Sequence, residues 1–280
     1  MSYYTNGDFA PARFDHIGLV STHSNNGICG SSCKRVTDSG ASGTALSAGL
    51  KTYNGAIGVN QDSIAVKTML EIAEEKGMST GLVATSAVTH ATPASFAAHV
   101  DYRKKEYEIA LQYAQKEIDV ILGGGKKFWP DSLIHEYEKR GAQYFNNIDT
   151  VLDPNKRLLG LFAEKAMPKV FEGRSPSTTE MAKLAISRLE NNPNGFFIMV
   201  EESQVDWGGH ANNANYIKHE MASLNELVNF ALDYQELHPD VLVVLTSDHE
   251  CGGVAIHDGK DNQLDIKFTS DYHSANFVPI

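Results

Sequence analysis

The chain has few cysteines, few tryptophans and an excess of negative charge. Its 280 residues include three cysteines and two tryptophans, and 35 acidic residues outnumber 24 lysines and arginines, for a formal net charge of −11. This balance excludes the basic face that a nucleic-acid-binding protein needs. The sequence also lacks a membrane span, a secretory signal, an internal repeat and a low-complexity tract. Its apolar fraction of 42% suits one enzyme-sized domain with a substantial core.

Cysteine gives little further information. Cys29 and Cys33 lie in a Gly/Ser-rich loop, close enough in sequence for a disulfide in an oxidising compartment, and free thiols are equally compatible with the sequence. Cys251 follows an Asp-His-Glu sequence that could bind metal, but we expect this thiol to serve packing.

The most informative segment that is present spans residues 36–45. It places Asp38 beside Ser39 and continues into small residues that can open a helix. One interpretation is a helix N-cap and turn, for which this composition is common. The other is a nucleophile facing a phosphate at a helix N-terminus. Because a serine hydroxyl is weakly acidic, the second interpretation requires a base or a metal ion, and no sequence neighbour of Ser39 supplies a base.

Possible metal ligands follow two apolar runs that we expect to be buried strands. Glu201 ends the run at residues 196–200, and Asp206 and His210 follow with the spacing of one helical turn. The run at residues 241–245 is followed by Asp248 and His249. A single buried histidine is more often a hydrogen-bonded core residue, but two clusters behind strands favour a ligand site, because open α/β sheets bind ligands at the carboxyl ends of their strands. Carboxylates with imidazoles suit zinc, and three protein ligands leave a position open for substrate or water.

The alternation of strand and helix patterns predicts an α/β fold, a three-layer sandwich with a mostly parallel central sheet flanked by helices. We expect a single domain over residues 1–280, with a peripheral insertion near 128–174. The patterns indicate helices at 63–76, 105–117 and 177–189, the last opened by a capping box at Ser177, and strands at 82–84, 120–122 and from 196.

Several segments together resemble the alkaline phosphatase family, in the family's order and over nearly the whole chain. They are Thr37-Asp38-Ser39 through Thr44-Ala45, residues 50–59, Thr89-His90-Ala91-Thr92-Pro93-Ala94, Ala98-His99-Val100-Asp101-Tyr102-Arg103, Val200-Glu201 through His210, Thr246-Ser247-Asp248-His249-Glu250 and His273-Ser274-Ala275. A histidine in a polar loop, such as His273, would carry little weight without this resemblance.

The resemblance implies two catalytic residues and three metal sites. Ser39 is implied as the residue phosphorylated in a covalent intermediate, and Arg103 as the guanidinium that clamps the phosphate oxygens. The implied ligands are Asp206, His210 and His273 for one zinc ion, Asp248, His249 and Ser39 for a second zinc ion, and Thr92 and Glu201 for magnesium. His90 stands where family members vary between aspartate and histidine, so it could shift the third site toward zinc.

The implied reaction is the hydrolysis of small phosphate monoesters to inorganic phosphate by two in-line displacements at phosphorus. The resemblance also implies a periplasmic or extracellular location and a possible homodimer.

The chain departs from the family at both ends. Family members begin with a strand that ends in a Gly-Asp-Gly-Met-Gly type segment, whose aspartate binds metal, whereas this sequence starts at what resembles the stretch after it. It also stops soon after His273, where the family continues. We therefore expect a truncated chain that lacks a metal-ligand carboxylate. Two alternatives stay open: an inactive, metal-poor fragment, and a related phosphodiesterase or sulfatase of the same superfamily.

Overall fold

The computed structural model of the chain describes residues 7–25, 35–260 and 264–280. Cys29 and Cys33 lie outside the described residues. A parallel five-stranded sheet in the order β4-β5-β3-β2-β6 forms the centre of the molecule. Its strands are β2 (Ser79–Ala87), β3 (Val120–Gly124), β4 (Ala142–Phe145), β5 (Arg157–Leu161) and β6 (Phe196–Glu201).

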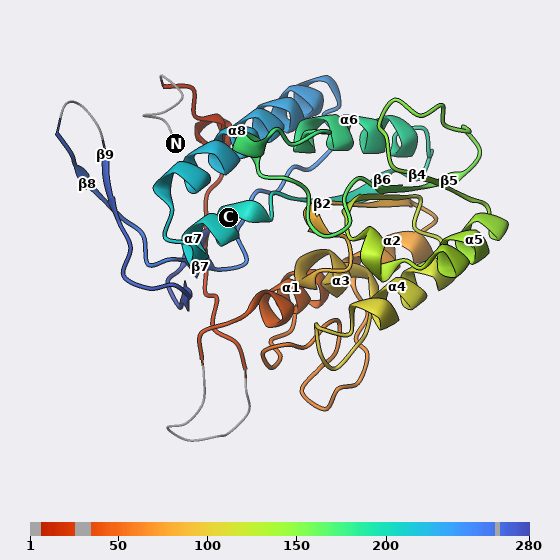
Figure 1. Cartoon of the computed structure of the whole chain (residues 1–280), viewed down its shortest axis with the longest axis horizontal. Coiled ribbons are helices and arrows are strands. Elements are labelled where there is room, and N and C mark those ends of the chain that lie inside the picture. Colours follow the sequence, from red (N-terminus) through yellow and green to blue (C-terminus); the bar gives the residue numbers. More distant parts are fainter. Residues whose placement is uncertain (1–6, 26–34, 261–263) are drawn as a thin grey trace.

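Helices cover both faces of this sheet, which confirms the expected three-layer α/β sandwich (Figure 1). One layer contains α6 (Thr178–Leu189) and α8 (Ala214–Leu237). The opposite layer contains α1 (Ser39–Ala48), α2 (Met69–Glu75), α3 (Ala91–Ala97), α4 (Glu106–Gln115) and α5 (Asp131–Lys139). The short helix α7 (Gln204–His210) follows the carboxyl end of β6.

Both faces of the central strands are buried, as the continuous apolar runs predict for a parallel sheet. Because side chains alternate along a strand, Leu82 and Ile121 belong to the core beneath α1 to α5. Their neighbours Val83 and Leu122 belong to the core beneath α6. The two cores hold the strand ends in fixed positions, which gives any side chain at those ends a rigid support.

Several strand and helix predictions based on local signals agree with the structure, and one helix prediction is partly wrong. The predicted strands at 82–84 and 120–122 lie within β2 and β3. Ser177 forms the predicted capping box with Glu180 at the start of α6. The predicted helix at 63–76 is wrong in its first half, because Thr68 forms a capping box with Glu71 and α2 begins only after it.

The prediction of a buried strand at residues 241–245 is also wrong. The segment belongs to no strand among the described residues, and the side chains of Leu242 and Val244 are 81% and 59% exposed. Only the alternate residues Val243 and Leu245 pack inward, on the core under α8. The apolar run has the composition of a strand, but a strand also needs a neighbour for its backbone hydrogen bonds, and a sequence pattern does not specify that neighbour.

Residues 128–174, expected to form a peripheral insertion, contribute α5, β4 and β5, and the two strands continue the central sheet to its edge. The division into one domain with an insertion stays a prediction. The remaining elements are short: η1 (Ala10–Arg13), η3 (Lys126–Phe128), η4 (Val170–Glu172), β1 (Leu19–Val20), β7 (Glu250–Cys251), β8 (Ala255–Asp258), β9 (Leu264–Lys267), β10 (His273–Ser274) and β11 (Val278–Pro279). Within the described part of the chain, no helix has both the length and the apolarity needed to cross a membrane.

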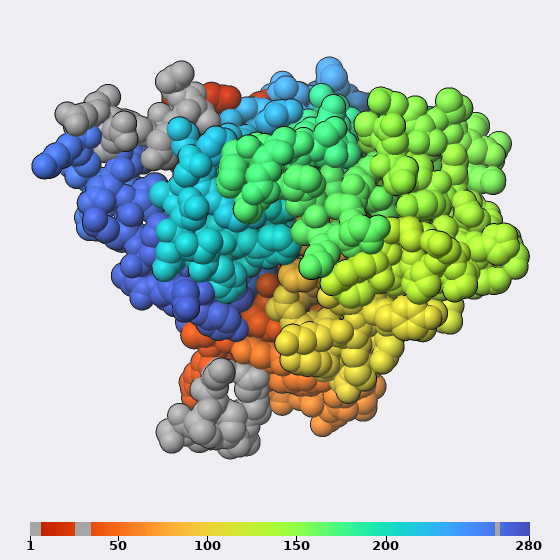
Figure 2. Space-filling model, in the orientation of Figure 1, coloured from red at the N-terminus to blue at the C-terminus, as the bar shows by residue number. Residues whose placement is uncertain are grey.

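Parts of the chain that are far apart in sequence meet beside α7. In Figure 2 the blue C-terminal residues lie against the cyan region of α7 and α8 and against the orange segment near α1. The pairing of β7 with β10 places Cys251 opposite His273. The ring of His273 in turn lies 2.7 Å from the backbone oxygen of Thr37, two residues before Ser39. The predicted site residues near α1, in α7 and around β7 and β10 therefore lie close together.

Candidate active site

Ser39 is the first residue of α1 and does not cap the helix. The cap is Asp38, whose Oδ1 accepts a hydrogen bond from the Ala41 backbone N–H at 3.0 Å. The Ser39 hydroxyl is therefore free for another role, and its Oγ lies 3.2 Å from His249 Nε2. This histidine is 210 residues away in sequence. The two interpretations of the segment thus apply to two adjacent residues, Asp38 as cap and Ser39 as candidate nucleophile.

Asp248 and His249 lie beside Ser39 in the loop that leads into β7. Asp248 Oδ2 lies 3.1 Å from His249 Nε2 and accepts a hydrogen bond from Ser42 Oγ at 3.0 Å. Burial is the largest single effect and opposes the charge on both groups, but it is outweighed by their mutual charge attraction and hydrogen bond together with smaller effects. The net result is a lowered pKa for Asp248 and a raised pKa for His249. Donor atoms of Ser39 and Asp248 therefore both lie within 3.2 Å of His249 Nε2.

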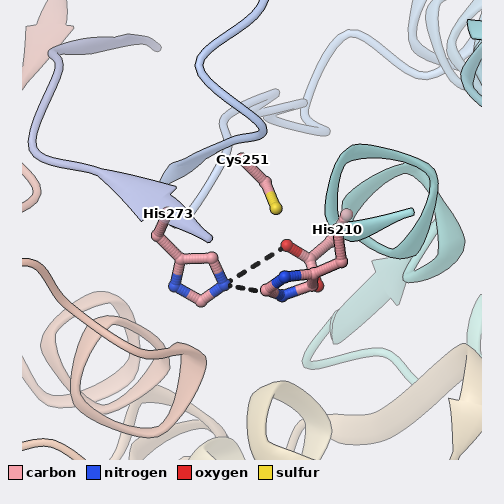
Figure 3. A group of neighbouring side chains, drawn as sticks. His210, Cys251 and His273 are labelled. Carbon is pink, nitrogen blue, oxygen red and sulfur yellow. Dashed lines mark hydrogen bonds and ion pairs between the residues drawn. The ribbon is translucent and has the colours of Figure 1, made fainter. Parts of the chain in front are cut away.

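Asp206, His210 and His273 form a second group of donors (Figure 3). The Nε2 atoms of His210 and His273 lie 3.1 Å apart. Each of these atoms lies 3.4 Å from a carboxylate oxygen of Asp206. Burial alone would raise the pKa of Asp206, but the His273 hydrogen bond and the charges of His249 and His210 hold it below its ordinary value.

Glu201 and Thr92 form a third group, where the end of β6 meets α3. Ser86 and Ser203 donate hydrogen bonds to Glu201 Oε2. Burial nevertheless raises the pKa of Glu201 to about 7, against the hydrogen bonds from Ser203 and Thr92. His90 caps α3 nearby, and burial, with the charge of Arg103, lowers its pKa to about 4. His90 is thus a neutral ring at ordinary pH.

Arg103 lies in the loop after α3 and contacts Asp38, the residue before Ser39. Its Nη1 donates to Asp38 Oδ2 at 3.0 Å, and its Nη2 lies 3.2 Å from His90 Nε2. The backbone N–H of Arg103 donates to the Gly55 carbonyl at 2.8 Å, which fixes the start of the side chain. Asp38 Oδ1 accepts a hydrogen bond from the Gly55 N–H at 2.9 Å. The carboxylate of Asp38 therefore binds the start of α1, the loop at Gly55 and the guanidinium of Arg103.

The donor sets fit divalent cations. Four carboxylates, of Asp38, Asp206, Asp248 and Glu201, lie close to one another and to the permanently charged guanidinium of Arg103. Asp206 Oδ1 and His249 Nδ1 are buried without a hydrogen-bond partner in the described residues. Unpaired buried acceptors and concentrated like charge are costly unless a cation offsets them. Mixed oxygen and imidazole donors suit zinc, and the hydroxyl of Thr92 with the Glu201 carboxylate suits magnesium.

Sequence reasoning missed the structural roles of three residues. Asp38 was seen as a neighbour of Ser39 and not as the brace of Arg103, and Ser42 was not singled out. Cys251 was expected to serve packing, but its sulfur lies in one group with the donors of Asp206, His210 and His273. Burial, and then the charge of Asp206, raises the pKa of this thiol. The sequence signal for this role of Cys251 is its position two residues after His249, because a thiol can also bind metal.

Comparisons with known proteins identify the family of the chain. The family model described as alkaline phosphatase matches residues 5–279. Alkaline phosphatase 3 of Bacillus subtilis is 43% identical over 235 residues, which is 80% of this chain and 51% of that protein. The alkaline phosphatase of Escherichia coli is 32% identical over 272 residues, covering 76% of this chain and 58% of that protein.

Solved structures give the same result. The alkaline phosphatase from the Antarctic bacterium TAB5 superposes with a TM-score of 0.88 at 36% identity, over 97% of this chain and 82% of that one. A variant of that enzyme, described with Mg bound in its M3 site, superposes with a TM-score of 0.87 at 35% identity, with the same coverage of both chains. The chain spans about half the length of the first curated relative. By the match over residues 5–279 and these similarities, the chain belongs to the alkaline phosphatase family.

Proposed function

We propose that the chain carries the active site of a phosphomonoesterase in which Ser39 is the nucleophile, with two zinc ions and one magnesium ion as cofactors. The observation that carries the proposal is the position of Ser39. Its Oγ lies at the first turn of a helix, 3.2 Å from His249 Nε2. His249 in turn lies 3.9 Å from Asp206 of the donor group of Asp206, His210 and His273, and Arg103 is bound to Asp38, the residue before Ser39.

In the first step the Ser39 Oγ forms a bond to phosphorus, the bond from phosphorus to the ester oxygen breaks, and the alcohol leaves. The amino end of α1 favours the negative charge of the phosphoryl group at this position. Arg103 offers a planar fork of donors to the phosphate oxygens, and Asp38 holds that fork in place. Water then attacks phosphorus on the opposite side, which frees Ser39 and inorganic phosphate.

The donors would hold three ions. Asp206, His210 and His273 would hold one zinc ion, and Asp248, His249 and Ser39 the other. Thr92 and Glu201, with His90 at hand, would hold magnesium. When bound, such ions favour deprotonation of a hydroxyl or water and offset negative charge on the attacking and leaving oxygens. Because charge at the leaving oxygen is offset in this way, the alcohol part of the ester contributes little to specificity, and small phosphate monoesters are the proposed substrates. A location outside the cytoplasm and a homodimer are further proposals that rest on the family resemblance.

The test is turnover of a chromogenic phosphate monoester by the chain supplied with zinc and magnesium. We expect Ser39→Ala to remove turnover, and acid quenching of the parent chain to trap one phosphoryl group on the peptide that contains Ser39. Ser187→Ala is the matched control, because Ser187 is an exposed serine of α6, and this variant should keep full activity.

The same assay with a phosphate diester and a sulfate ester compares the related superfamily reactions. The proposal fails if the metal-supplied chain is no faster than Ser39→Ala, or if the phosphoryl group is found elsewhere. Faster hydrolysis of the diester than of the monoester would support the phosphodiesterase alternative instead.

A further inference from the structure

Cys251 is held against the donor group of Asp206, His210 and His273 by backbone packing. Its strand β7 pairs with β10, which places Cys251 opposite His273. On the other side, α7 approaches so closely that a Cβ atom on Gly209 would lie 2.8 Å from the Cys251 carbonyl oxygen and 3.0 Å from its Cβ. A glycine is therefore required at 209, and the position of the thiol relative to Asp206 and His210 is fixed by two elements.

The thiol points into the donor group. Figure 3 shows the sulfur of Cys251 facing the imidazoles of His210 and His273. One ligand atom from each of these residues and from Asp206 lies within 4.8 Å of all the others. In a tetrahedral zinc site with bonds of about 2.0–2.1 Å to nitrogen and oxygen and about 2.3 Å to sulfur, the ligand atoms are about 3.3–3.6 Å apart. The two separations of 3.4 Å between Asp206 and the histidines match that range, and the 3.1 Å between the two histidine Nε2 atoms lies just below it.

A second observation points to a cation at the same place. The side chain of His249 is 1% exposed, and its Nδ1 has no hydrogen-bond partner among the described residues. This atom lies 3.9 Å from Asp206 Oδ1, which is itself 3.4 Å from His273 Nε2. A buried, unpaired ring nitrogen beside four ligand groups is typical of a site whose charge balance includes an ion.

We propose that Cys251 is a fourth protein ligand, through its sulfur, of a soft divalent cation of the zinc class held with Asp206, His210 and His273. The thiol proton passes to solvent as the bond from sulfur to metal forms. A sulfur donor selects zinc, cadmium or cobalt over magnesium. Zinc can expand to five-coordinate, so a fourth protein ligand still leaves one position for substrate or water. The inference adds a ligand to one metal site of the proposed function, but its test does not depend on turnover.

The experiment uses the full chain with Cys29→Ser and Cys33→Ser, so that Cys251 is the one remaining thiol of the three in the sequence. Cobalt(II) is the probe, added to the metal-free protein, because a bond between thiolate and cobalt gives a strong charge-transfer band in the near ultraviolet. We expect this band to saturate at one cobalt per chain and to disappear when zinc is added. Zinc should also protect the thiol from a disulfide reagent.

Cys251→Ser in the same background is the matched variant. It should lose the charge-transfer band and bind cobalt at least about tenfold more weakly, since even residues that only support a ligand cost 10–100-fold in metal affinity. The inference is overturned if tetrahedral cobalt binds without the charge-transfer band, which would make Cys251 a hydrogen-bonding neighbour of Asp206. It is equally overturned if cobalt does not bind. A charge-transfer band without phosphatase activity would instead count against the proposed function and leave the sulfur ligand in place.

Discussion

Arg174 is predicted to be one of the most important single residues for the stability of the fold. It lies between η4 and α6, and its guanidinium bridges Glu202, just after β6, and Glu220 of α8. The side chains of Arg174, Glu202 and Glu220 are 2%, 2% and 0% exposed. Arg174 Nη2 donates to Glu220 Oε2 at 2.6 Å, and its Nε donates to the Pro168 carbonyl at 2.8 Å. The residue thus joins three parts of the chain inside the protein.

The perturbation is Arg174→Met, which keeps the length of the side chain and removes its charge. Glu202 keeps hydrogen bonds from Thr178 and Ser223, and Glu220 keeps one from the Val170 N–H. Neither carboxylate keeps a cation. Removing one partner of a buried ion pair costs about 3–5 kcal/mol, because a buried charge is left uncompensated. We expect a loss in that range, a large part of the ~5–15 kcal/mol that stabilises a typical domain.

The loss should depend on pH in a definite direction. Burial raises the pKa of Glu202 to about 7, and Arg174 is the main group that opposes this shift. Without Arg174 the folded pKa rises further above the unfolded value, so the protonated form of Glu202 is favoured in the folded state. The contribution of Glu202 to the stability of the variant is then greatest at low pH and falls as pH rises through that pKa. The difference from the parent chain should therefore be smaller at pH 5 than at pH 8.

Urea unfolding followed by tryptophan fluorescence measures the effect, with the midpoint expected to fall and the slope to stay constant. Adding Glu220→Gln to Arg174→Met should recover part of the loss, because one uncompensated charge is removed. Lys139→Met is the control, since Lys139 and Glu136 form a pair on the surface of α5, and we expect no measurable change. A loss below about 1 kcal/mol for Arg174→Met, or one that grows toward low pH, would contradict the reasoning.

Three further predictions concern the stability of the fold. Burial opposes ionisation of Glu71, but hydrogen bonds from His99 and Lys116 lower its pKa, so the ionised side chain stabilises the fold above the ordinary carboxyl pKa of 4.5. Glu71→Gln should therefore lower the free energy of unfolding in urea at pH 7, and this loss should shrink as pH falls below about 4.5. A deficit that is constant with pH would argue against this pairing. Ser177→Ala removes the cap of α6 and should cost about 1 kcal/mol in the same assay, whereas an unchanged midpoint would show that the cap is dispensable. Gly58→Ala should lower the midpoint of thermal unfolding strongly, because Gly58 has a φ of +58° and an added Cβ would lie 2.2 Å from a backbone oxygen. A midpoint equal to that of the parent chain would contradict this prediction of backbone strain.

Local interactions explain the parts of the fold that could be predicted. The capping box at Ser177 involves residues three apart, and the apolar runs in β2 and β3 have the composition of strands buried on both faces. Both signals come from residues that are close together in the sequence. The predicted helix start at residue 63 failed for a related reason, because the capping box at Thr68 is an equally local signal that was not used.

The candidate site was predictable in its residue types and not in its contacts. The spacing of Asp206 and His210 indicates a shared helical face, and they do share one ligand group. The roles of the individual site residues stay predictions. The brace between Asp38 and Arg103 spans 65 residues, and the sequence contains no signal for it.

The sequence by itself determined the family, the alternation of strands and helices, and the identity of the groups that can bind metal or attack phosphorus. These follow from residue types and short spacings. Only the tertiary structure decided that residues 241–245 pair with no described strand, that Asp38 caps α1 and leaves Ser39 beside His249, and that the sulfur of Cys251 joins Asp206, His210 and His273. The physical reason is that strand pairing, burial and donor separation depend on how distant segments pack, and these distances have no counterpart in the order of residues along the chain.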